Sequence, residues 1–94
     1  MFEKSGSEKK TSNGLLAVGA VPTRVFSLSS ESAIARVIKL RNSSASGNVY
    51  VTLNVAANNG NSISFSKGRL FPSGCYVDLD NNASGATIEY TKEQ

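Results

Sequence analysis

The sequence predicts an all-β protein, either an antiparallel β-sandwich or a small jelly roll, with about six or seven short strands. Apolar and polar residues alternate in several short segments, and this period of two is typical of half-buried strands. Valine, isoleucine and threonine are frequent in these segments, and such β-branched residues favour strands over helices. Loops rich in Asn, Ser and Gly separate the segments, as short antiparallel connections require.

The clearest strand lies within residues 47–56, G-N-V-Y-V-T-L-N-V-A. Its apolar residues occupy every second position: Val49, Val51, Leu53 and Val55. In a strand, this spacing places them on one face and Tyr50 on the other. We therefore expect a central strand whose aliphatic face forms the core.

Two segments precede this strand near the start of the chain. Residues 14–21 are apolar without clear periodicity and end at Pro22, so they form a short strand or cross the sandwich. Residues 24–28 alternate as a strand does, with Phe26 and Leu28 on one face.

Residues 32–42 fit two patterns. In a strand, Ile38 and Leu40 share a face with Arg36, whereas a period of about 3.6 gives a helix with an apolar stripe. We favour the strand because the segment is rich in β-branched residues. The turn-rich residues 42–48 that follow can supply a hairpin loop into the central strand.

The second half of the chain contains further strands. Asn59 and Gly60 tolerate the positive φ angles of a tight hairpin turn, so we expect a turn there. Strands are then expected in residues 62–66, 75–79 and 86–91, each with alternating apolar positions.

The composition indicates a single domain. A chain of 94 residues can form one modest core, and the hydrophobic fraction of 39% makes that core thin. Chains of this kind often complete their core by forming oligomers. Residues 1–13 are polar and charged, which predicts a flexible N-terminal arm, and residues 14–94 then form one β-sandwich domain. No apolar run approaches the roughly 20 residues of a membrane-spanning helix, so neither membrane insertion nor conventional secretion is expected.

Several classes of chemistry lack the residues they need. The chain has no histidine and a single cysteine, Cys75, which excludes His/Cys metal sites, Ser-His and Cys-His catalysis, and an internal disulfide. Asp78 and Asp80 share a strand face, but a calcium ion needs more oxygen ligands than two carboxylates supply. We expect neither an enzyme nor a cofactor.

Two groups of residues are candidates for an interface. Arg36, Lys39 and Arg41 lie in a basic middle region and form either a phosphate-binding patch or a solvated or subunit-facing surface. Tyr50 and Tyr76 each lie opposite the aliphatic residues of their strands, where a tyrosine marks either a subunit contact or a plain surface position.

The sequence resembles the small all-β structural proteins of tailed-bacteriophage particles. The resemblance covers roughly residues 24–91 and lies in R-V-F-S-L, in I-K-L-R-N-S-S-A-S before V-Y-V-T-L, and in L-F-P-S-G-C-Y-V-D-L-D. It implies a non-enzymatic virion component, assembled in the host cytoplasm and present in many symmetric copies. Its partners would be other copies of itself and other capsid or tail proteins, as a decoration, head-tail junction or fibre component.

The leading hypothesis is therefore a structural assembly protein that acts through subunit contacts and forms a homo-oligomer. The alternative is a small basic β-domain that binds nucleic acid or another polyanion through Arg36, Lys39, Arg41 and Arg69. Salt separates the two hypotheses, because polyanion binding weakens steeply with ionic strength and a β-rich interface does not.

Overall fold

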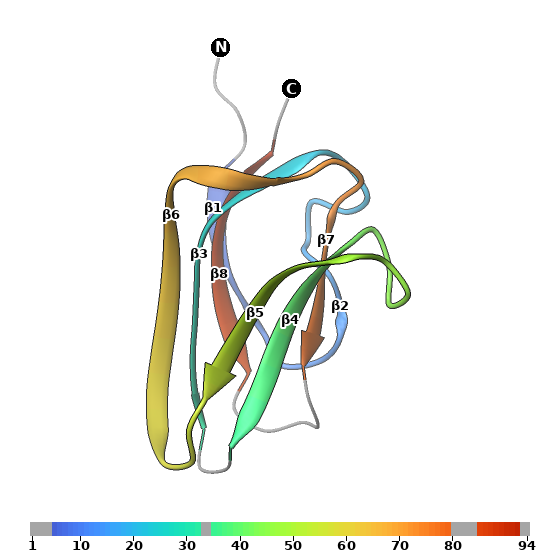
Figure 1. Cartoon of the computed structure of the whole chain (residues 1–94). Coiled ribbons are helices and arrows are strands. Elements are labelled where there is room, and N and C mark those ends of the chain that lie inside the picture. The colour runs from blue at the N-terminus through green and yellow to red at the C-terminus, as the bar shows by residue number, and fades with distance from the viewer. Residues whose placement is uncertain (1–4, 33–34, 80–84, 93–94) are drawn as a thin grey trace.

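The computed structural model describes residues 5–32, 35–79 and 85–92, which form eight strands. The strands are β1 (Ser5–Lys10), β2 (Gly14–Leu15), β3 (Thr23–Ser32), β4 (Arg36–Asn42), β5 (Val49–Val55), β6 (Asn59–Phe71), β7 (Cys75–Leu79) and β8 (Ala86–Lys92). They form two antiparallel four-stranded sheets that pack face to face (Figure 1). The predicted all-β sandwich is confirmed, with more strands than expected. No helix in the described ranges is long and apolar enough to cross a membrane.

The strand order follows from one long hairpin that has been rolled up. Sheet 1 has the order β1-β8-β3-β6, and sheet 2 has the order β2-β7-β4-β5. Along the chain, β1 pairs with β8, β2 with β7, β3 with β6 and β4 with β5. Rolling up the hairpin also places β3 beside β8 and β4 beside β7. These two pairs join the strands into the two four-stranded sheets. This arrangement is an eight-stranded jelly roll, one of the two architectures that the sequence predicts.

The expected N-terminal arm is mostly part of sheet 1. Residues 5–10 form β1 and pair with β8 from Ser5 opposite Thr91 to Lys10 opposite Ala86, so the expectation of an arm up to residue 13 is wrong for this stretch. The stretch has no large apolar side chain to bury. It is held in sheet 1 by backbone hydrogen bonds to β8 instead. Glu8 adds a tertiary contact, because its Oε1 accepts a hydrogen bond from the Ala17 amide at 2.7 Å. Residues 1–4 lie outside the described ranges.

The central strand departs from strict alternation at its start. Val51, Leu53 and Val55 are buried as expected, but Val49 is 41% exposed. The pairing of β4 with β5 shifts between Leu40–Val51 and Arg41–Val49, which leaves Tyr50 as an extra residue. Such a bulge exchanges the two faces between its two sides, so Val49 turns outward although the positions after the bulge face the core. Tyr50 consequently packs against the core, although its place in the pattern predicts that it points away from the aliphatic face.

A second bulge changes the faces of β3. Its pairing shifts between Val25 and Ser27 on both neighbouring strands. Against β8, Phe26 is the extra residue, whereas against β6 the extra residues are 65–68 of β6, which lie between the partners Ser64 and Arg69. Val25 and Leu28 are both fully buried, and Phe26 is only half-buried. The expected grouping of Phe26 with Leu28 is therefore wrong, because the bulge restores Val25 to the core side.

The strand prediction for the ambiguous segment is confirmed over Arg36–Asn42, and residues 33–34 lie outside the described ranges. Arg36, Ile38 and Leu40 face the interior together, as a period of two requires. Residues 43–48 form the predicted loop into β5, closed by a hydrogen bond from the Asn42 amide to Asn48 O at 2.9 Å. A side chain at Gly47 would overlap Asn42 O, which explains a glycine at this closely packed position.

The expected hairpin turn at Asn59 and Gly60 is wrong. The chain turns at residues 57–58, where Asn58 has a φ of 57°. Asn59 and Gly60 already belong to β6 and pair with Ser32 and Glu31 of β3. The turn also joins different sheets, since β5 is an edge of sheet 2 and β6 is an edge of sheet 1. An asparagine one position earlier thus supplies the left-handed conformation.

The core lies between the two sheets. Its members come from strands of both sheets and from the segment after β2: Leu16, Val25, Leu28, Ile38, Leu40, Val51, Leu53, Val55, Phe71, Cys75, Val77, Leu79, Ala86, Ile88 and Tyr90. Those of β7 and β8 alternate without interruption, as the sequence predicts. Phe71 is the largest fully buried side chain, and Cys75 is a free, buried thiol.

Candidate functional site

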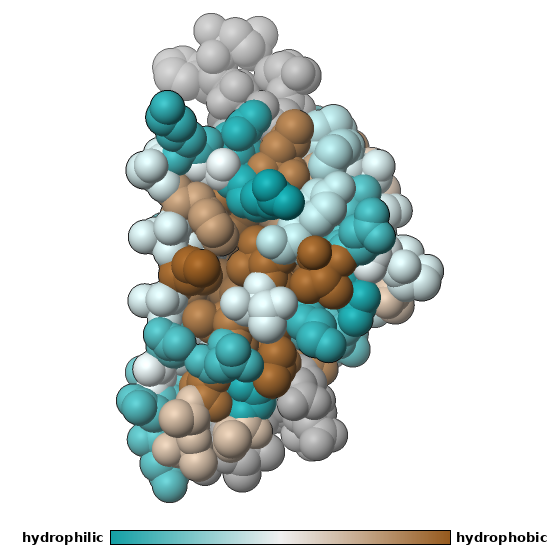
Figure 2. Space-filling view, in the orientation of Figure 1, coloured by the Kyte–Doolittle hydropathy of each residue, from teal (hydrophilic) through white to brown (hydrophobic). Residues whose placement is uncertain are grey.

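One side of the sandwich exposes part of its interior. It lies between β5 and β6, the edge strands of the two sheets, and we call it the open side. Tyr50 of β5 and Ile63 and Phe65 of β6 pack against the core there but remain partly exposed. Figure 2 looks onto this side and shows apolar residues gathered down its middle between polar margins. A continuous apolar strip at the edge of both sheets is the kind of surface that a partner covers.

The two strands beside the open side lack the usual protection against edge-to-edge pairing. Neither β5 nor residues 59–66 of β6 contain a charged residue. On the opposite side of the sandwich, β1 carries Glu8, Lys9 and Lys10, and β2 has only two residues. Charged side chains and short strands are the devices by which proteins block a free edge. The open side is therefore the less protected of the two sides.

An aromatic cluster supports the upper part of the open side. The Tyr50 and Phe71 rings lie 5.2 Å apart with an interplanar angle of 43°. The Arg69 guanidinium carbon lies 4.6 Å from the Tyr50 ring centroid, so the ring is held between a buried phenyl group and a cation. At the lower part, the Asn61 side-chain amide donates to Asn54 O at 2.8 Å and bridges the two edges.

The structure separates the predicted interface residues. Lys39, Arg41 and Tyr76 are half-buried outer residues of sheet 2, where Arg41 pairs with Asp78 through a 2.9 Å contact. Tyr50 lies at the open side instead. Arg36 is only 3% exposed, so its expected place in a surface patch is wrong. The strand period already puts Arg36 on the core side, and only its charge favours a surface patch.

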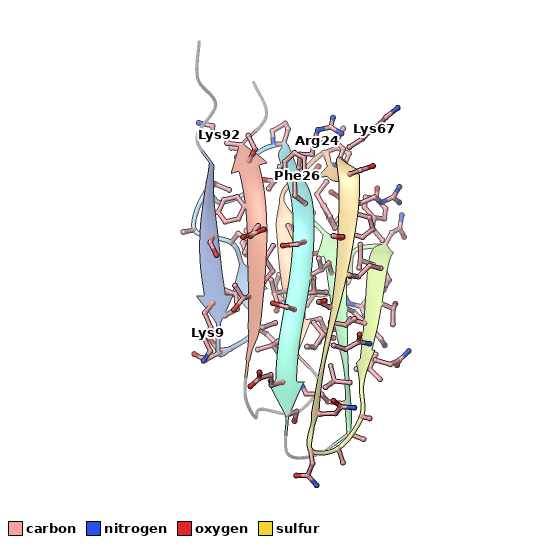
Figure 3. The ribbon with its side chains drawn as sticks, turned by 90° about the vertical axis from the view of Figure 1, so that its left-hand side faces the viewer. Lys9, Arg24, Phe26, Lys67 and Lys92 are labelled. Atoms are coloured by element: carbon pink, nitrogen blue, oxygen red, sulfur yellow. The ribbon has the colours of Figure 1, made fainter. Side chains whose placement is uncertain are left out.

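A different set of basic residues comes together at one end of sheet 1. Figure 3 shows Arg24 and Lys67 near Phe26 at the top of this sheet, with Lys92 apart from them over β8 and Lys9 at the opposite end. The Arg24 guanidinium donates to Lys67 O at 3.3 Å. Gly68, with a φ of 78°, lets β6 pass close by, because a side chain there would overlap the Arg24 stem. We call these three residues, Arg24, Phe26 and Lys67, the basic corner.

No motif in the sequence marks the basic corner. Its members come from β3 and the long β6, which are far apart in the chain. They are brought together by the β3–β6 pairing. Sequence reasoning could have found them only from the strand order.

A hollow with a polar lining lies over sheet 1. Its volume is about 570 Å³, and its lining includes Lys9, Ser29, Glu31, Ser62 and Thr87. Glu31 is the one acidic residue of this lining, and the hydroxyl groups have no histidine beside them. This lining can bind water or a polar group, but it offers no pair of acid and base for catalysis.

No group of three or more His, Cys, Asp or Glu residues that could hold a metal occurs in residues 5–32, 35–79 and 85–92. Asp78 is engaged by Arg41, and Asp80 lies outside these ranges. The carboxylate pair suggested by the sequence therefore stays a prediction. Comparison of the chain with known protein families, curated proteins and solved structures finds no match.

Proposed function

We propose that this chain is a non-enzymatic assembly protein that binds further copies of itself through the open side. The observation that carries the proposal is the combination of a partly exposed apolar strip with two uncharged edge segments, β5 and residues 59–66 of β6. An edge without charges can pair with an identical edge, because the two copies bring no like charges together. The apolar strip then gains the burial that the single sandwich does not give it.

The contact that fits these edges best is a two-fold pairing of β6 with β6. Within the described residues, β6 pairs with β3 on one side and with no strand on the other. Antiparallel pairing of two β6 edges satisfies the free backbone groups of both copies and is self-complementary. It joins the four strands of sheet 1 in each copy into one continuous sheet. Ile63 and Phe65 then lie next to their counterparts, on the inner face of that sheet.

The setting that we propose is a bacteriophage particle, on the strength of the sequence resemblance described above. The jelly roll supports this by analogy, because viral capsid proteins use it, but so do lectins and cupins. A small module that pairs by its edges suits a particle in which many symmetric copies meet. The capsid or tail proteins that it would contact belong to the same proposal.

Replacing Phe65 by asparagine tests the assembly proposal. The wild-type chain is expected to form a discrete oligomer, and the variant to weaken self-association at least about tenfold, because it removes an apolar ring from the interface. The mass in solution, measured by light scattering over a range of concentrations, reports the change. The oligomer is expected to persist at about 0.5 M salt, since its contacts are uncharged.

The matched control is Ser64→Asn, which introduces the same side chain at the neighbouring exposed position of β6. It is expected to leave the mass unchanged. Circular dichroism verifies that both variants retain the β-sheet. A wild-type chain that stays monomeric at every concentration contradicts the proposal, and so does an equal loss of mass in both variants.

The basic corner supports a second candidate function, the binding of a single-stranded nucleic acid or another polyanion. Its two cations lie beside an aromatic residue, the combination that such surfaces use for phosphates and bases. It replaces the patch predicted from the sequence, in which Arg36 is buried.

Replacing Arg24 and Lys67 by glutamine tests this second candidate. Binding of a single-stranded oligonucleotide is expected to weaken, and the slope of log affinity against log salt to fall by about 1.4, or about 0.7 for each phosphate that is no longer neutralised. Fluorescence anisotropy at several salt concentrations measures both quantities. Lys9→Gln with Lys39→Gln removes the same charge elsewhere and is expected to leave the slope nearly unchanged. Equal slopes for the two double variants contradict specific use of the basic corner.

A further inference from the structure

Arg36 is the most unusual buried residue among those described. It begins β4 and faces the interior with Ile38 and Leu40, and only 3% of its surface is exposed. None of its three side-chain nitrogens, Nε, Nη1 and Nη2, has a hydrogen-bond partner among the described residues. The chain therefore places a guanidinium group inside the sandwich without a partner from that part of the protein.

Physical chemistry makes this arrangement costly. An arginine side chain stays protonated in proteins and carries five N–H donors, so it does not escape burial by losing its charge. A buried charge without a partner costs several kcal/mol, and the strongest compensation is a hydrogen-bonded group of opposite charge. A carboxylate suits this role best, because its two oxygens match the fork of the guanidinium.

A hollow adjoins Arg36 at this end of the sandwich. It has a volume of about 400 Å³ and lies between the beginning of β4 and the end of β5, where Arg36 is paired with Val55. Its lining consists of Ala35, Arg36, Val37, Asn54, Val55 and Ala56. Apart from Arg36, the side chains of this lining are small or aliphatic, with Asn54 as the one polar exception. The hollow is large enough for a carboxylate group with a short apolar stem.

We propose that this hollow binds a carboxylate group and that Arg36 supplies the positive charge that pairs with it. A single guanidinium in an apolar lining matches one negative charge, whereas a phosphate dianion would leave a net charge buried there. Because the guanidinium nitrogens are buried, binding includes a rearrangement of the side chains between them and the hollow. The carboxylate comes from a small molecule or from an acidic side chain of a second copy, and both use the same chemistry.

The test is thermal unfolding of the full chain in sodium acetate and in sodium chloride at equal ionic strength. Acetate near ten times its dissociation constant is expected to raise Tm by about 5 °C or more. Arg36→Met keeps a long, flexible side chain without the charge and is expected to abolish this shift. In chloride its Tm is expected to equal or exceed that of the wild type, because an unpaired buried charge has been removed. Lys39→Met, on the other face of β4, is the matched control and is expected to keep the shift.

A second arm distinguishes the two sources of the carboxylate. If a second copy supplies it, the Tm of the wild type in chloride rises more steeply with protein concentration than the Tm of Arg36→Met does, whereas assembly through the open side alone gives both proteins the same rise. The Phe65→Asn variant, which is expected to be monomeric, is expected to show the acetate shift as well, so the carboxylate site is tested separately from the assembly proposal. An acetate shift of equal size in Arg36→Met, or no shift in the wild type together with a lower Tm of Arg36→Met in chloride, overturns the carboxylate site.

Discussion

Replacing Phe71 by alanine is expected to lower the free energy of unfolding by about 3–5 kcal/mol, the cost typical of removing a large side chain from a core. Phe71 is the last residue of β6, is fully buried, and pairs with Thr23 of β3. It also packs against Tyr50, so the substitution opens a cavity between the two sheets. Domains of this size are stable by only about 5–15 kcal/mol, and the loss therefore takes a large share. Urea unfolding followed by circular dichroism measures it.

Leu70 provides the control for this prediction. It is the neighbouring residue of β6 but is 37% exposed, so Leu70→Ala is expected to cost much less. The Phe71 substitution has a second expected effect, because Tyr50 loses the ring that supports it beside Arg69. Self-association is then expected to weaken even where the variant is still folded. Equal stability losses for the two variants would show that Phe71 is not the anchor that its burial indicates.

The sequence predicts the strands best where alternation is unbroken and apolar. In β7 and β8, the residues at every second position are buried over most of each strand, and the pattern alone identifies both the strands and their inner faces. The short loop between β4 and β5 is also predictable, because its residues favour turns and its two strands are neighbours in the chain. These features depend on residues that are close together in the chain, so the sequence alone is enough to predict them.

The errors arise where the structure depends on pairing. The bulges at Phe26 and Tyr50 each insert one residue relative to β8 and β4, and neither residue type marks a bulge. The inner and outer positions exchange between the two sides of each bulge, so a single period gives an incorrect face on one side of it. Strand β1 could not be predicted for a related reason. It has no apolar face, so its sequence shows no strand pattern, and only its pairing with β8 makes it a strand.

The candidate sites are even less predictable, because each combines residues from different strands. The open side exists because β5 and β6 are edges of different sheets, and the basic corner because β3 pairs with β6. Arg36 shows the limit most clearly. Its position in the pattern indicates burial, its charge indicates exposure, and only the packing of the two sheets decides between them.

Raising the pH is expected to destabilise the protein through Cys75. Burial of its thiol, with a smaller contribution from the negative charge of Glu8, raises the pKa of Cys75 from 9.0 to about 12. The unfolded chain loses the thiol proton above pH 9, whereas the folded chain keeps it until about pH 12. The contribution of the protonated Cys75 thiol to the free energy of unfolding is therefore fully present below pH 9. It is lost as the pH rises from 9 towards 12, by about 1.4 kcal/mol for each pH unit. Burial and Glu8 raise the pKa of Tyr90 too, which acts in the same direction.

The contribution of Cys75 is measured by comparing the wild type with Cys75→Ala in urea unfolding at several pH values between about 8 and about 11. The variant is less stable near neutral pH because it lacks core volume, but its stability is expected to fall less steeply with pH. At about pH 11, the wild type is expected to have lost about 2–3 kcal/mol more of its free energy of unfolding than the variant, each relative to its own value near neutral pH. Tyr90 titrates in both proteins, so its effect cancels in the comparison. If both proteins lose stability in parallel, the Cys75 thiol titrates equally in the folded and unfolded chain, and the sandwich must open to water around β7 at high pH.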